Sequence, residues 1–315
     1  MDPLSDVLRA VRLDGAFFFV IEAWSPWSLN IGAARALEPR VLPNSEHLIA
    51  YHILTAGRAW AGPPGGTQVC LQPGDAILFP HGMPHFLSGE RGVQVFPGMM
   101  NSRPERYLEW IRMDGTGEST ATFVCGFLGC DAFPFNPLLA SLPPMLHMPS
   151  LTTGWLAEFP RQVIAESQQQ REGASTMLTR MAELMFIEVV RRHLASDGSA
   201  AHGWLAGLRD PVVAPALVAL HARPAHAWTL SELATEASAS RSVLAERFTE
   251  VVGVPPMQYL TQWRLQLAAE QLASCTDKVS AIGMRVGYES DAAFSRAFKR
   301  ATGKSPAAWR RQRAS

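Results

Sequence analysis

Basic side chains gather near the end of the chain, where they could bind the phosphates of a nucleic acid. Residues 278–315 hold nine Lys and Arg against two Asp and Glu, although the whole chain of 315 residues balances at 28 of each. Residues 224–315 carry 12 basic and 8 acidic side chains, whereas residues 1–223 carry 16 and 20. Because phosphate contacts dominate nucleic-acid binding, this asymmetry favours a nucleic-acid module joined to a second domain. On charge alone, an ordinary solvated surface explains the composition equally well.

A helix-turn-helix pattern lies within this basic part of the chain. Thr229 and Glu232 form a capping box, which satisfies the unpaired N–H groups at the start of a helix. A turn of small residues follows, and Ser240 can cap a second helix. Leu244 and Phe248 are four residues apart on that second helix and predict its buried side.

The same pattern returns nearer the C-terminus. Ser290 is placed to cap a helix on which Phe294 and Phe298 form the buried pair. Between the two patterns, Pro256 can open a long helix that would hold them at a fixed separation. A helix-turn-helix leaves one side of its second helix free to enter a major groove, so the sequence predicts contact with two successive grooves. The two predicted units span residues 229–252 and 279–302.

The buried positions also predict which side chains face the DNA. Arg296 is the strongest candidate for a base contact, because a guanidinium pairs bidentately with guanine, and a phosphate contact is the alternative. Glu246 would accept from cytosine N4 or pair with a neighbouring Arg. Arg241, Lys299 and Arg300 are expected to contact phosphates, which position a protein without specifying a base. The candidate DNA-contacting residues are Arg241, Ser242, Ala245, Glu246, Thr249, Ser290, Ala292, Ser295, Arg296, Lys299 and Arg300.

A signature runs through the second unit: Gly287-Tyr288-x-Ser290, Phe294-x-x-x-Phe298-Lys299, Gly303-x-Ser305-Pro306 and Arg310. Through these residues, the segment 211–311 resembles the AraC-type (AraC/XylS) DNA-binding domain. The resemblance implies a sequence-specific transcriptional regulator, expected to be an activator, whose partners are double-stranded promoter DNA and RNA polymerase. It also places the base-contacting positions at Ser242, Ala245, Glu246, Ala292, Ser295 and Arg296.

The first part of the chain has the pattern of β structure. Aromatic and β-branched runs separated by Gly and Pro predict a sandwich or barrel. Gly74-x5-Pro80-x-Gly82-x2-His85 has the spacing of the second cupin motif. The region 1–130 therefore resembles the cupin-type ligand-binding barrel of one group of AraC-type regulators. The expected fold class is α+β: an N-terminal cupin-like β-barrel with following helices, and a C-terminal all-α domain with two helix-turn-helix units.

Histidines in this region suggest a metal site. His47, His52 and His85 could form a three-imidazole centre that binds a divalent metal such as zinc. The alternative is that each is a polar pocket residue or a core group with its hydrogen bonds satisfied. His52 and His85 are also candidates for sensing a ligand.

Because some cupins are metal oxygenases, an enzyme with a DNA-binding tail is an alternative function. The expected first-motif ligands, His-x-His and Glu, are replaced by Pro43, Ser45 and Ala50, which argues against catalysis. An architectural DNA binder with an inert first domain is a second alternative.

Cys125 and Cys130 lie five residues apart and are further candidates for sensing. Regulators of the cupin subgroup include some that respond to oxidants through cysteines, so this thiol pair could form a disulfide and reshape the domain. The alternative is that both are small buried apolar residues on a strand.

The helical period over residues 154–195 predicts amphipathic helices that pack on the first domain, form a homodimer, or do both. The expected domains are residues 1–195 for sensing, 196–210 as a linker and 211–315 for DNA binding. No apolar run is long enough to cross a membrane, and no secretory signal is present, so a cytoplasmic regulator of transcription is expected. Its effector would be a small molecule or an oxidant.

Overall fold

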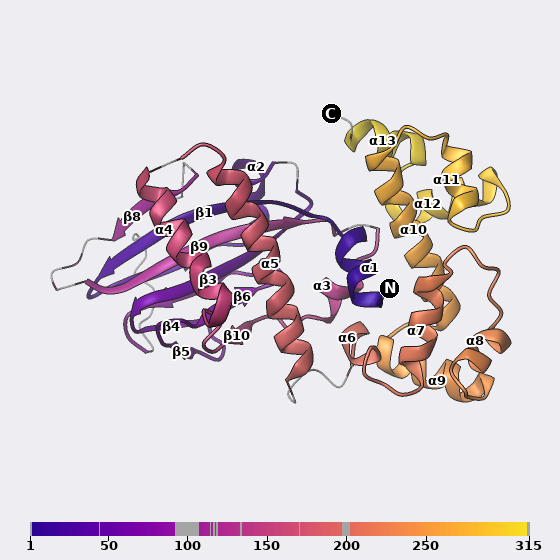
Figure 1. Cartoon of the computed structure of the whole chain (residues 1–315), viewed down its shortest axis with the longest axis horizontal. Helices are drawn as coiled ribbons and strands as arrows, with labels where there is room; N and C mark the ends of the chain where they lie inside the picture. Colours follow the sequence, from indigo (N-terminus) through magenta and orange to yellow (C-terminus); the bar gives the residue numbers. More distant parts are fainter. Residues whose placement is uncertain are drawn as a thin grey trace. The chain divides into compact units, whose positions relative to one another are not determined.

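The chain forms two compact units in a computed structural model (Figure 1). One unit combines residues 1–12, 132–141 and 194–315, and the other combines residues 13–131 and 142–193. The structure describes residues 2–43, 45–91, 107–113, 115, 117, 119–132, 134–169, 171–196 and 202–313.

This division differs from the domain ranges expected from the sequence. Residues 1–12 and 132–141 belong to the unit of the C-terminal helices, although they come from the first part of the chain. Within the expected linker, residues 197–201 lie outside the described residues, and Trp204–Gly207 forms helix α6. None of the described helices has the length and apolar character needed to cross a membrane.

The described strands of the β unit form two sheets rather than the closed barrel expected from the sequence. The six-stranded sheet has the order β10-β6-β3-β9-β1-β8, and the four-stranded sheet has the order β2-β7-β4-β5. The edge strands β5 and β10 have three residues each, so they offer few backbone groups for further pairing. The strands are β1 Leu13–Trp24, β2 Ser28–Ile31, β3 His47–Gly57, β4 Ala59–Gly62, β5 Val69–Leu71, β6 Ala76–Phe79, β7 His85–Ser88, β8 Glu109–Met113, β9 Ser119–Cys130 and β10 Leu146–Met148.

Alternate side chains of the central strands fill the space between the two sheets. Strand β9 pairs antiparallel with β1 on one side and β3 on the other. Phe123, Cys125 and Phe127 of β9 point to the same face of the sheet, because strand side chains alternate. All three belong to an apolar cluster that includes residues from both sheets. Large side chains therefore occupy the interior of this unit.

Two helices, α4 (Glu158–Gln169) and α5 (Ala174–Ala195), lie along the other face of the six-stranded sheet (Figure 1). The Phe159 ring of α4 packs against the rings of Phe18 and Tyr51, with centroids 6.1 and 6.3 Å away. The even-numbered residues of β1 and the odd-numbered residues of β3 thus face these helices. Helix α4 thus packs on the sheet of its own unit, which is one of the two roles expected for the 154–195 region.

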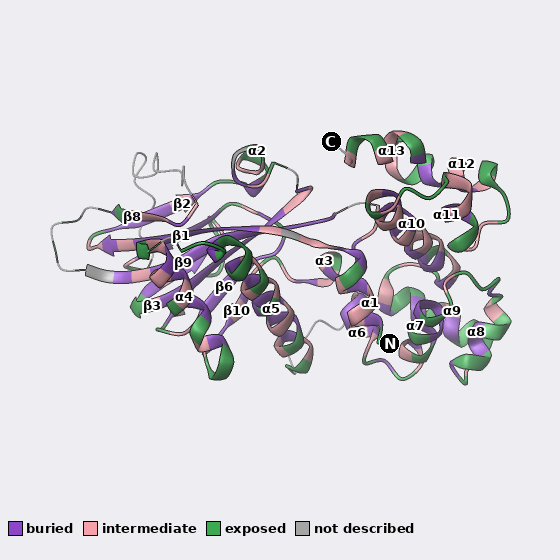
Figure 2. Ribbon diagram, turned by 45° about the horizontal axis from the view of Figure 1, so that its top comes forward, coloured by how far each residue is buried: buried purple, intermediate pink, exposed green. Residues whose placement is uncertain are grey.

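Helix α10 (Pro256–Ser274) is the central element of the helical unit. Near its start, Tyr259 packs against Phe248 of α9, with ring centroids 5.7 Å apart. Further along, Leu265 and Leu272 join the apolar cluster that surrounds Phe298 of α12. Figure 2 shows exposed residues along the outer sides of α8, α11 and α12. The other helices are α1 Pro3–Ala10, α2 Glu38–Val41, α3 Pro137–Ser141, α7 Val213–Ala222, α8 Leu230–Glu236, α9 Arg241–Val252, α11 Val279–Arg285, α12 Asp291–Thr302 and α13 Pro306–Arg313.

Gln266 of α10 explains why two early segments belong to the helical unit. The Gln266 side chain is 1% exposed, and its amide N–H donates to the Ala10 carbonyl at the end of α1 at 2.8 Å. Its Oε1 accepts from the Phe135 N–H at 3.0 Å. Helix α1 leads into β1, and the segment containing Phe135 follows β9. Leu13 of β1 and Cys130 of β9 pair in the sheet. Gln266 therefore bonds to the segment before β1 and to the segment after β9.

Replacing Gln266 by leucine should destabilise the helical unit. The Gln266→Leu variant removes the hydrogen bonds to the buried Ala10 carbonyl and the part-buried Phe135 N–H, and an unpaired buried group costs about 1–3 kcal/mol. Urea unfolding of the full chain, followed by tryptophan fluorescence, measures the loss. As a control, Gln258→Leu replaces an exposed glutamine on the same helix and should change the free energy of unfolding by less than about 0.5 kcal/mol. A loss for Gln266→Leu no larger than that of the control contradicts the bridging role.

Candidate nucleic-acid interface

Helices α8 and α9 form the first helix-turn-helix unit. The Thr229 hydroxyl accepts from the Glu232 N–H at 3.2 Å, and the Glu232 carboxylate accepts from the Thr229 N–H at 2.8 Å, which confirms the expected capping box. Ser240 accepts from the Val243 N–H at 3.3 Å and begins α9. Gly253 ends α9 with a φ of 88°, a left-handed conformation that glycine adopts without a steric penalty.

Helices α11 and α12 form the second unit in a similar way. The Ser290 hydroxyl accepts from the Ala293 N–H at 3.2 Å and caps α12, as expected. Gly283 of α11 lies against the Phe294 ring, and a Cβ atom at Gly283 would come within 2.9 Å of ring carbons. A residue without a side chain therefore lets α11 and α12 approach this closely.

The two second helices, α9 and α12, each bury one side and expose the other. Leu244, Phe248, Phe294 and Phe298 are all 0% exposed, as the sequence predicts. The candidate DNA-contacting residues lie away from these buried positions. Those that are exposed are Arg241, Ser242, Glu246, Thr249, Ser290, Ala292, Arg296, Lys299 and Arg300, and those that are partly exposed are Ala245 and Ser295.

The candidate hydroxyl groups and the candidate cations differ in their existing contacts. Thr249 donates to the Ala245 carbonyl of its own helix at 2.7 Å, and Ser242 shares a 3.1 Å hydrogen bond with the capping Ser240. By contrast, neither Arg296 nor Lys299 forms an ion pair with any residue that the structure describes. Arg296 and Lys299 of α12 are therefore available to bind an incoming anion.

Arg247, which the sequence did not single out, fixes α9 in place. Its guanidinium donates to Asp210 at 2.8 Å and to Glu250 at 2.7 Å. Partial burial raises the pKa of Asp210, but hydrogen bonds from Val213 and Arg247 outweigh it and hold that pKa below its ordinary value. Because Arg247 is already paired, the alternative in which Glu246 pairs with this neighbour is not observed. No sequence signal marks Arg247, since Asp210 precedes it by 37 positions.

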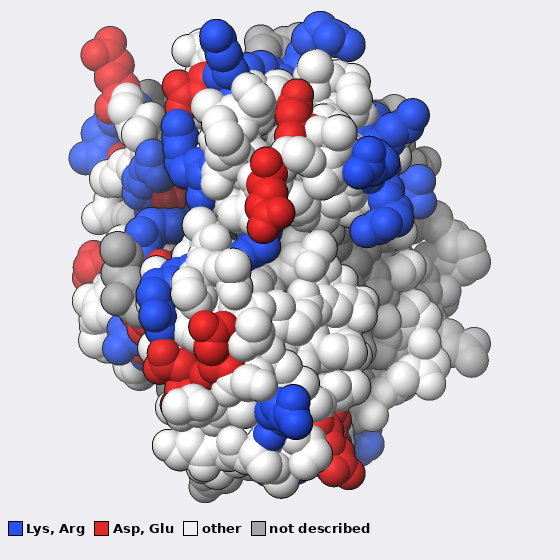
Figure 3. Space-filling view, turned by 90° about the vertical axis from the view of Figure 1, so that its right-hand side faces the viewer, with Lys and Arg blue, Asp and Glu red and all other residues white. Residues whose placement is uncertain are grey.

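The charge distribution on this unit is visible in Figure 3, where groups of Lys and Arg surround a largely uncharged surface that carries a few acids. Arg310, a residue of the sequence signature, has a structural contact: its guanidinium donates to the Asp277 carbonyl at 2.6 Å and links α13 to the segment before α11. Exposed Lys299, Arg300 and Arg311 belong to the same end of the chain.

In the β unit, His52, His85 and Cys125 converge between the sheets. His85 Nδ1 lies 2.8 Å from the Met83 carbonyl and must carry the proton there, so neutral His85 presents a lone pair at Nε2. His52 Nε2, at 2.8 Å, then donates to it, and His52 Nδ1 accepts from the Cys125 thiol at 2.9 Å. Burial lowers the pKa of His85 to about 4. Burial, with a contribution from His85, also holds the pKa of His52 well below its ordinary value.

The predicted three-imidazole metal centre is not assembled, which corrects the expectation for His47, His52 and His85. His47 precedes His52 by five positions on β3, so its side chain points to the opposite face, and its Nε2 bonds to the Pro80 carbonyl at 2.6 Å. Across the part of the chain that the structure describes, no three or more His, Cys, Asp or Glu side chains are grouped to hold a metal ion.

Of the two alternatives for Cys125 and Cys130, the structure favours small buried apolar residues on a strand, because a disulfide between them is incompatible with the folded strand. Five positions of extended chain separate the two residues by about 16 Å, whereas the Cα atoms of a disulfide lie within about 7 Å. They also point to opposite faces of β9. Both side chains are buried, at 0% and 1% exposure, and burial raises the pKa of both thiols. Both cysteines are therefore protonated and shielded in this structure.

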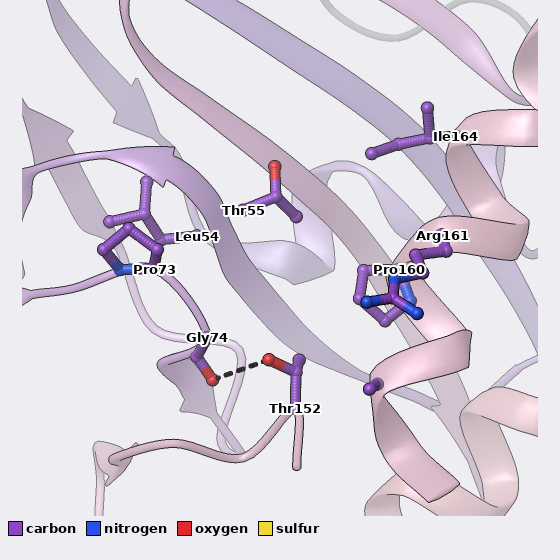
Figure 4. A pocket seen from close by; sticks show the side chains of 9 residues that line it. Leu54, Thr55, Pro73, Gly74, Thr152, Pro160, Arg161 and Ile164 are labelled. Carbon is purple, nitrogen blue, oxygen red and sulfur yellow. Dashed lines mark hydrogen bonds between the residues drawn. The ribbon is translucent and has the colours of Figure 1, made fainter. Parts of the chain in front are cut away.

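A pocket of about 310 Å³ lies between the end of β3, the turn before β6, and helix α4 (Figure 4). Thr55 and Gly74 line one side, and Pro160 and Ile164 of α4 line the other. Thr152 donates to the Gly74 carbonyl at 3.3 Å. The volume is at the lower end of the range for small-molecule sites. No sequence signal indicated this pocket, because its residues come from distant segments.

Comparison with known proteins agrees with both units. A Cupin family model matches residues 2–195, and a Helix-turn-helix domain model matches residues 233–312. The chain is 34% identical over 316 residues to a putative AraC-like transcription regulator of Streptomyces lividans, covering 99% of this chain and 98% of the relative. It is 30% identical over 321 residues to the HTH-type transcriptional regulator AlkR of Acinetobacter baylyi, covering 99% and 100%. It is also 29% identical over 314 residues to the RCS-specific HTH-type transcriptional activator RclR of Escherichia coli, covering 98% and 97%.

Two capped helix-turn-helix units joined to a β-rich unit define a DNA-binding regulator of transcription. The chain belongs to the family of AraC-like transcription regulators, with an N-terminal cupin domain. The alternative of a cupin metalloenzyme is not supported, because these relatives are named as regulators. Among solved structures, the DNA-binding domain of AdpA in complex with a target DNA is 30% identical, covers 33% of this chain and 92% of that chain, and has a TM-score of 0.31.

The buried imidazoles should make the β unit less stable in acid. The pKa of His85 is about 4 when folded, and an unfolded His has a pKa of about 6.5. The unfolded state therefore takes up the proton first, so stability is lost as the pH falls from about 6.5 towards 4, and His85 accounts for about 2 kcal/mol of this loss at pH 5. Urea unfolding at pH 7.5 and pH 5 measures the difference.

Two variants identify the source of this pH dependence. His85→Gln should lose about 2 kcal/mol less than the wild type between the two pH values. His202→Gln replaces an exposed histidine and should match the wild type. If His85→Gln loses as much stability as the wild type, His85 is not held neutral by burial.

Proposed function

We propose that this regulator contacts promoter DNA with both helix-turn-helix units of each chain, and that the β unit controls binding in response to a small molecule. The observation that supports this most directly is the arrangement of α9 and α12, each buried on one side by apolar residues and exposed on the other. Such helices fit a major groove while their hydrophobic sides stay packed.

On α12, Arg296 is the proposed base-reading residue, flanked by Ala292 and Ser295. Its guanidinium is exposed and has no acidic partner among the described residues, so it can form a bidentate pair with guanine. Lys299 and Arg300 follow on the exposed side and are proposed to bind phosphates. This division assigns specificity to the first half of the helix and general affinity to the second.

On α9, Glu246 is the proposed polar reader, with Ser242 and Ala245 beside it. A carboxylate can accept a hydrogen bond from cytosine N4. Arg241 at the start of the helix is proposed to bind a phosphate. The first unit thus has fewer long donors than the second and would contribute less to affinity.

The proposed effector is a small molecule that binds the 310 Å³ pocket beside α4. The interior between the sheets is filled by large side chains, whereas this pocket offers space of a ligand's size. The alternative, oxidation of Cys125 or Cys130, has less support because thiolates are the reactive form and both buried thiols have raised pKa values.

A homodimer through α5 is the proposed assembly. Met177 and Leu184 lie seven positions apart on the exposed side of α5, with exposures of 39% and 50%. An exposed apolar stripe of this spacing suits packing against a second helix.

Contact with RNA polymerase at the promoter is a further proposed interaction, because the chain acts as a transcription regulator. A cytoplasmic location is proposed for the same reason.

The proposed signal path runs through α10. Gln266 of α10 is hydrogen-bonded to the ends of the segments that continue into β1 and β9. A movement of these two strands would therefore act through the Gln266 hydrogen bonds on α10, the helix that joins both DNA-binding units.

The Arg296→Ala variant should lose affinity for a preferred DNA site more than for random DNA. The expected loss on a site selected with the wild-type protein is about 1–3 kcal/mol, because a bidentate base contact is removed. Fluorescence anisotropy at fixed salt measures it. Lys299→Ala is the matched control, and it should weaken binding to both DNAs equally and reduce the salt slope by about one. Equal losses for Arg296→Ala on both DNAs would make Arg296 a phosphate contact.

Filling the pocket should remove the response to an effector. A small-molecule library is screened for compounds that alter binding of the full-length protein to its selected site. Ile164→Trp places a large side chain in the pocket and should abolish the response while DNA binding without the compound is kept. Gln168→Trp alters an exposed position of the same helix and should respond normally. An unchanged response in Ile164→Trp would place the effector elsewhere.

A further inference from the structure

Arg264, in the middle of α10, joins the two helix-turn-helix units through backbone carbonyls. Its Nε donates to the Pro224 carbonyl at 2.7 Å, and one terminal nitrogen donates to the His226 carbonyl at 2.7 Å. The other terminal nitrogen donates to the Gly287 carbonyl at 3.2 Å. Pro224 and His226 precede α8 of the first unit, whereas Gly287 forms the turn between α11 and α12 of the second. One guanidinium therefore bridges both units.

The two units also approach each other closely at this point. Gly287 has a φ of 94°, and a Cβ atom there would lie 2.8 Å from Ala225 and 2.9 Å from the Arg264 guanidinium carbon. The turn of the second unit thus lies directly against the loop that leads into the first. A glycine at this position allows the contact, and Arg264 provides the hydrogen bonds across it.

The loop on the first side is itself firmly held. The Trp228 indole N–H donates to the Arg223 carbonyl at 3.1 Å, and the Arg223 guanidinium lies 4.5 Å from the centroid of the Trp228 ring. Arg223 also pairs with Glu236 at the end of α8. These contacts fix the loop relative to α8, so the positions of the Pro224 and His226 carbonyls are coupled to the position of α8.

The chemistry of this bridge requires arginine. A guanidinium is planar and presents its N–H donors in a fixed fork, so three carbonyls in set positions determine its orientation. A lysine ammonium is a single point at the end of a flexible chain and cannot span the same three acceptors. All three acceptors are backbone carbonyls, so the three hydrogen bonds depend directly on the positions of the backbone in both units.

We propose that Arg264 is a positioning residue that fixes the orientation of α9 relative to α12 and thereby sets the spacing between the two DNA segments that one chain contacts. Each helix-turn-helix unit has its own apolar core against α10, so each can stay folded when the bridge is removed. What the bridge adds is a restraint on rotation of one unit against the other. This role rests on the proposed contact of both helix-turn-helix units with DNA, and it assigns the spacing requirement to one side chain.

The experiment measures spacing preference with the full-length protein. A two-part site is obtained by selecting random duplexes with the wild-type protein, and derivatives receive one, two or five added base pairs between the parts. A site with only the part bound by α12 is included. Affinities are compared for the wild type, Arg264→Met and Arg264→Lys. Gln258→Met is the control, because it changes an exposed side chain of the same helix and leaves the Arg264 contacts in place.

The wild type and Gln258→Met should lose more than tenfold in affinity when two base pairs are added. Arg264→Met should bind the original site about tenfold more weakly, but should lose less than threefold on insertion and bind the single-part site as the wild type does. Arg264→Lys should fall between them, and it decides the matter if Arg264→Met does not fold, as judged by circular dichroism. A folded Arg264 variant with the wild-type insertion penalty, or with equal losses on single and two-part sites, overturns the proposal. If the wild type itself tolerates all insertions, contact by both units fails, and the role of Arg264 fails with it.

Discussion

Burial of one side of α9 and α12 is the constraint on which the DNA-binding surface depends. Phe248 in the first unit and Phe294 and Phe298 in the second are fully buried within the helical unit. Because side chains three and four positions apart share a helix face, burial of these rings determines which residues remain outside. The caps at Ser240 and Ser290 determine the residue at which each helix begins. They therefore also determine the position of every exposed side chain along the helix axis.

Helix α10 carries two polar side chains that form hydrogen bonds with the backbone of neighbouring segments. Arg264 bonds to carbonyls of both helix-turn-helix units, and Gln266 bonds to the two segments that continue into the β unit. A polar group with few solvent contacts is favourable only when its hydrogen bonds are made, so each of these side chains favours one arrangement of its neighbours. Apolar packing alone would tolerate more rotation and sliding.

The features that the sequence predicted correctly are local. The capping box at Thr229 and the buried Phe pair of α12 depend on residues within a few positions of each other, so their pattern is visible in the chain. The features it missed depend on distant partners, as with Arg247 and Asp210. Closure of the barrel and the inclusion of His47 in a metal site were wrong, whereas for Cys125 and Cys130 the structure favours the alternative of small buried apolar residues over a disulfide. The faces to which His47, Cys125 and Cys130 point depend on strand register, which the sequence alone does not give.

The central claim is that one chain contacts DNA at two places held in a fixed relation. Hydroxyl-radical footprinting of the full-length protein on a selected duplex tests this directly. The account predicts two protected patches per chain on one face of the DNA, about one helical turn or 10 base pairs apart. A single protected patch per chain, with no second patch at any protein concentration, would contradict it.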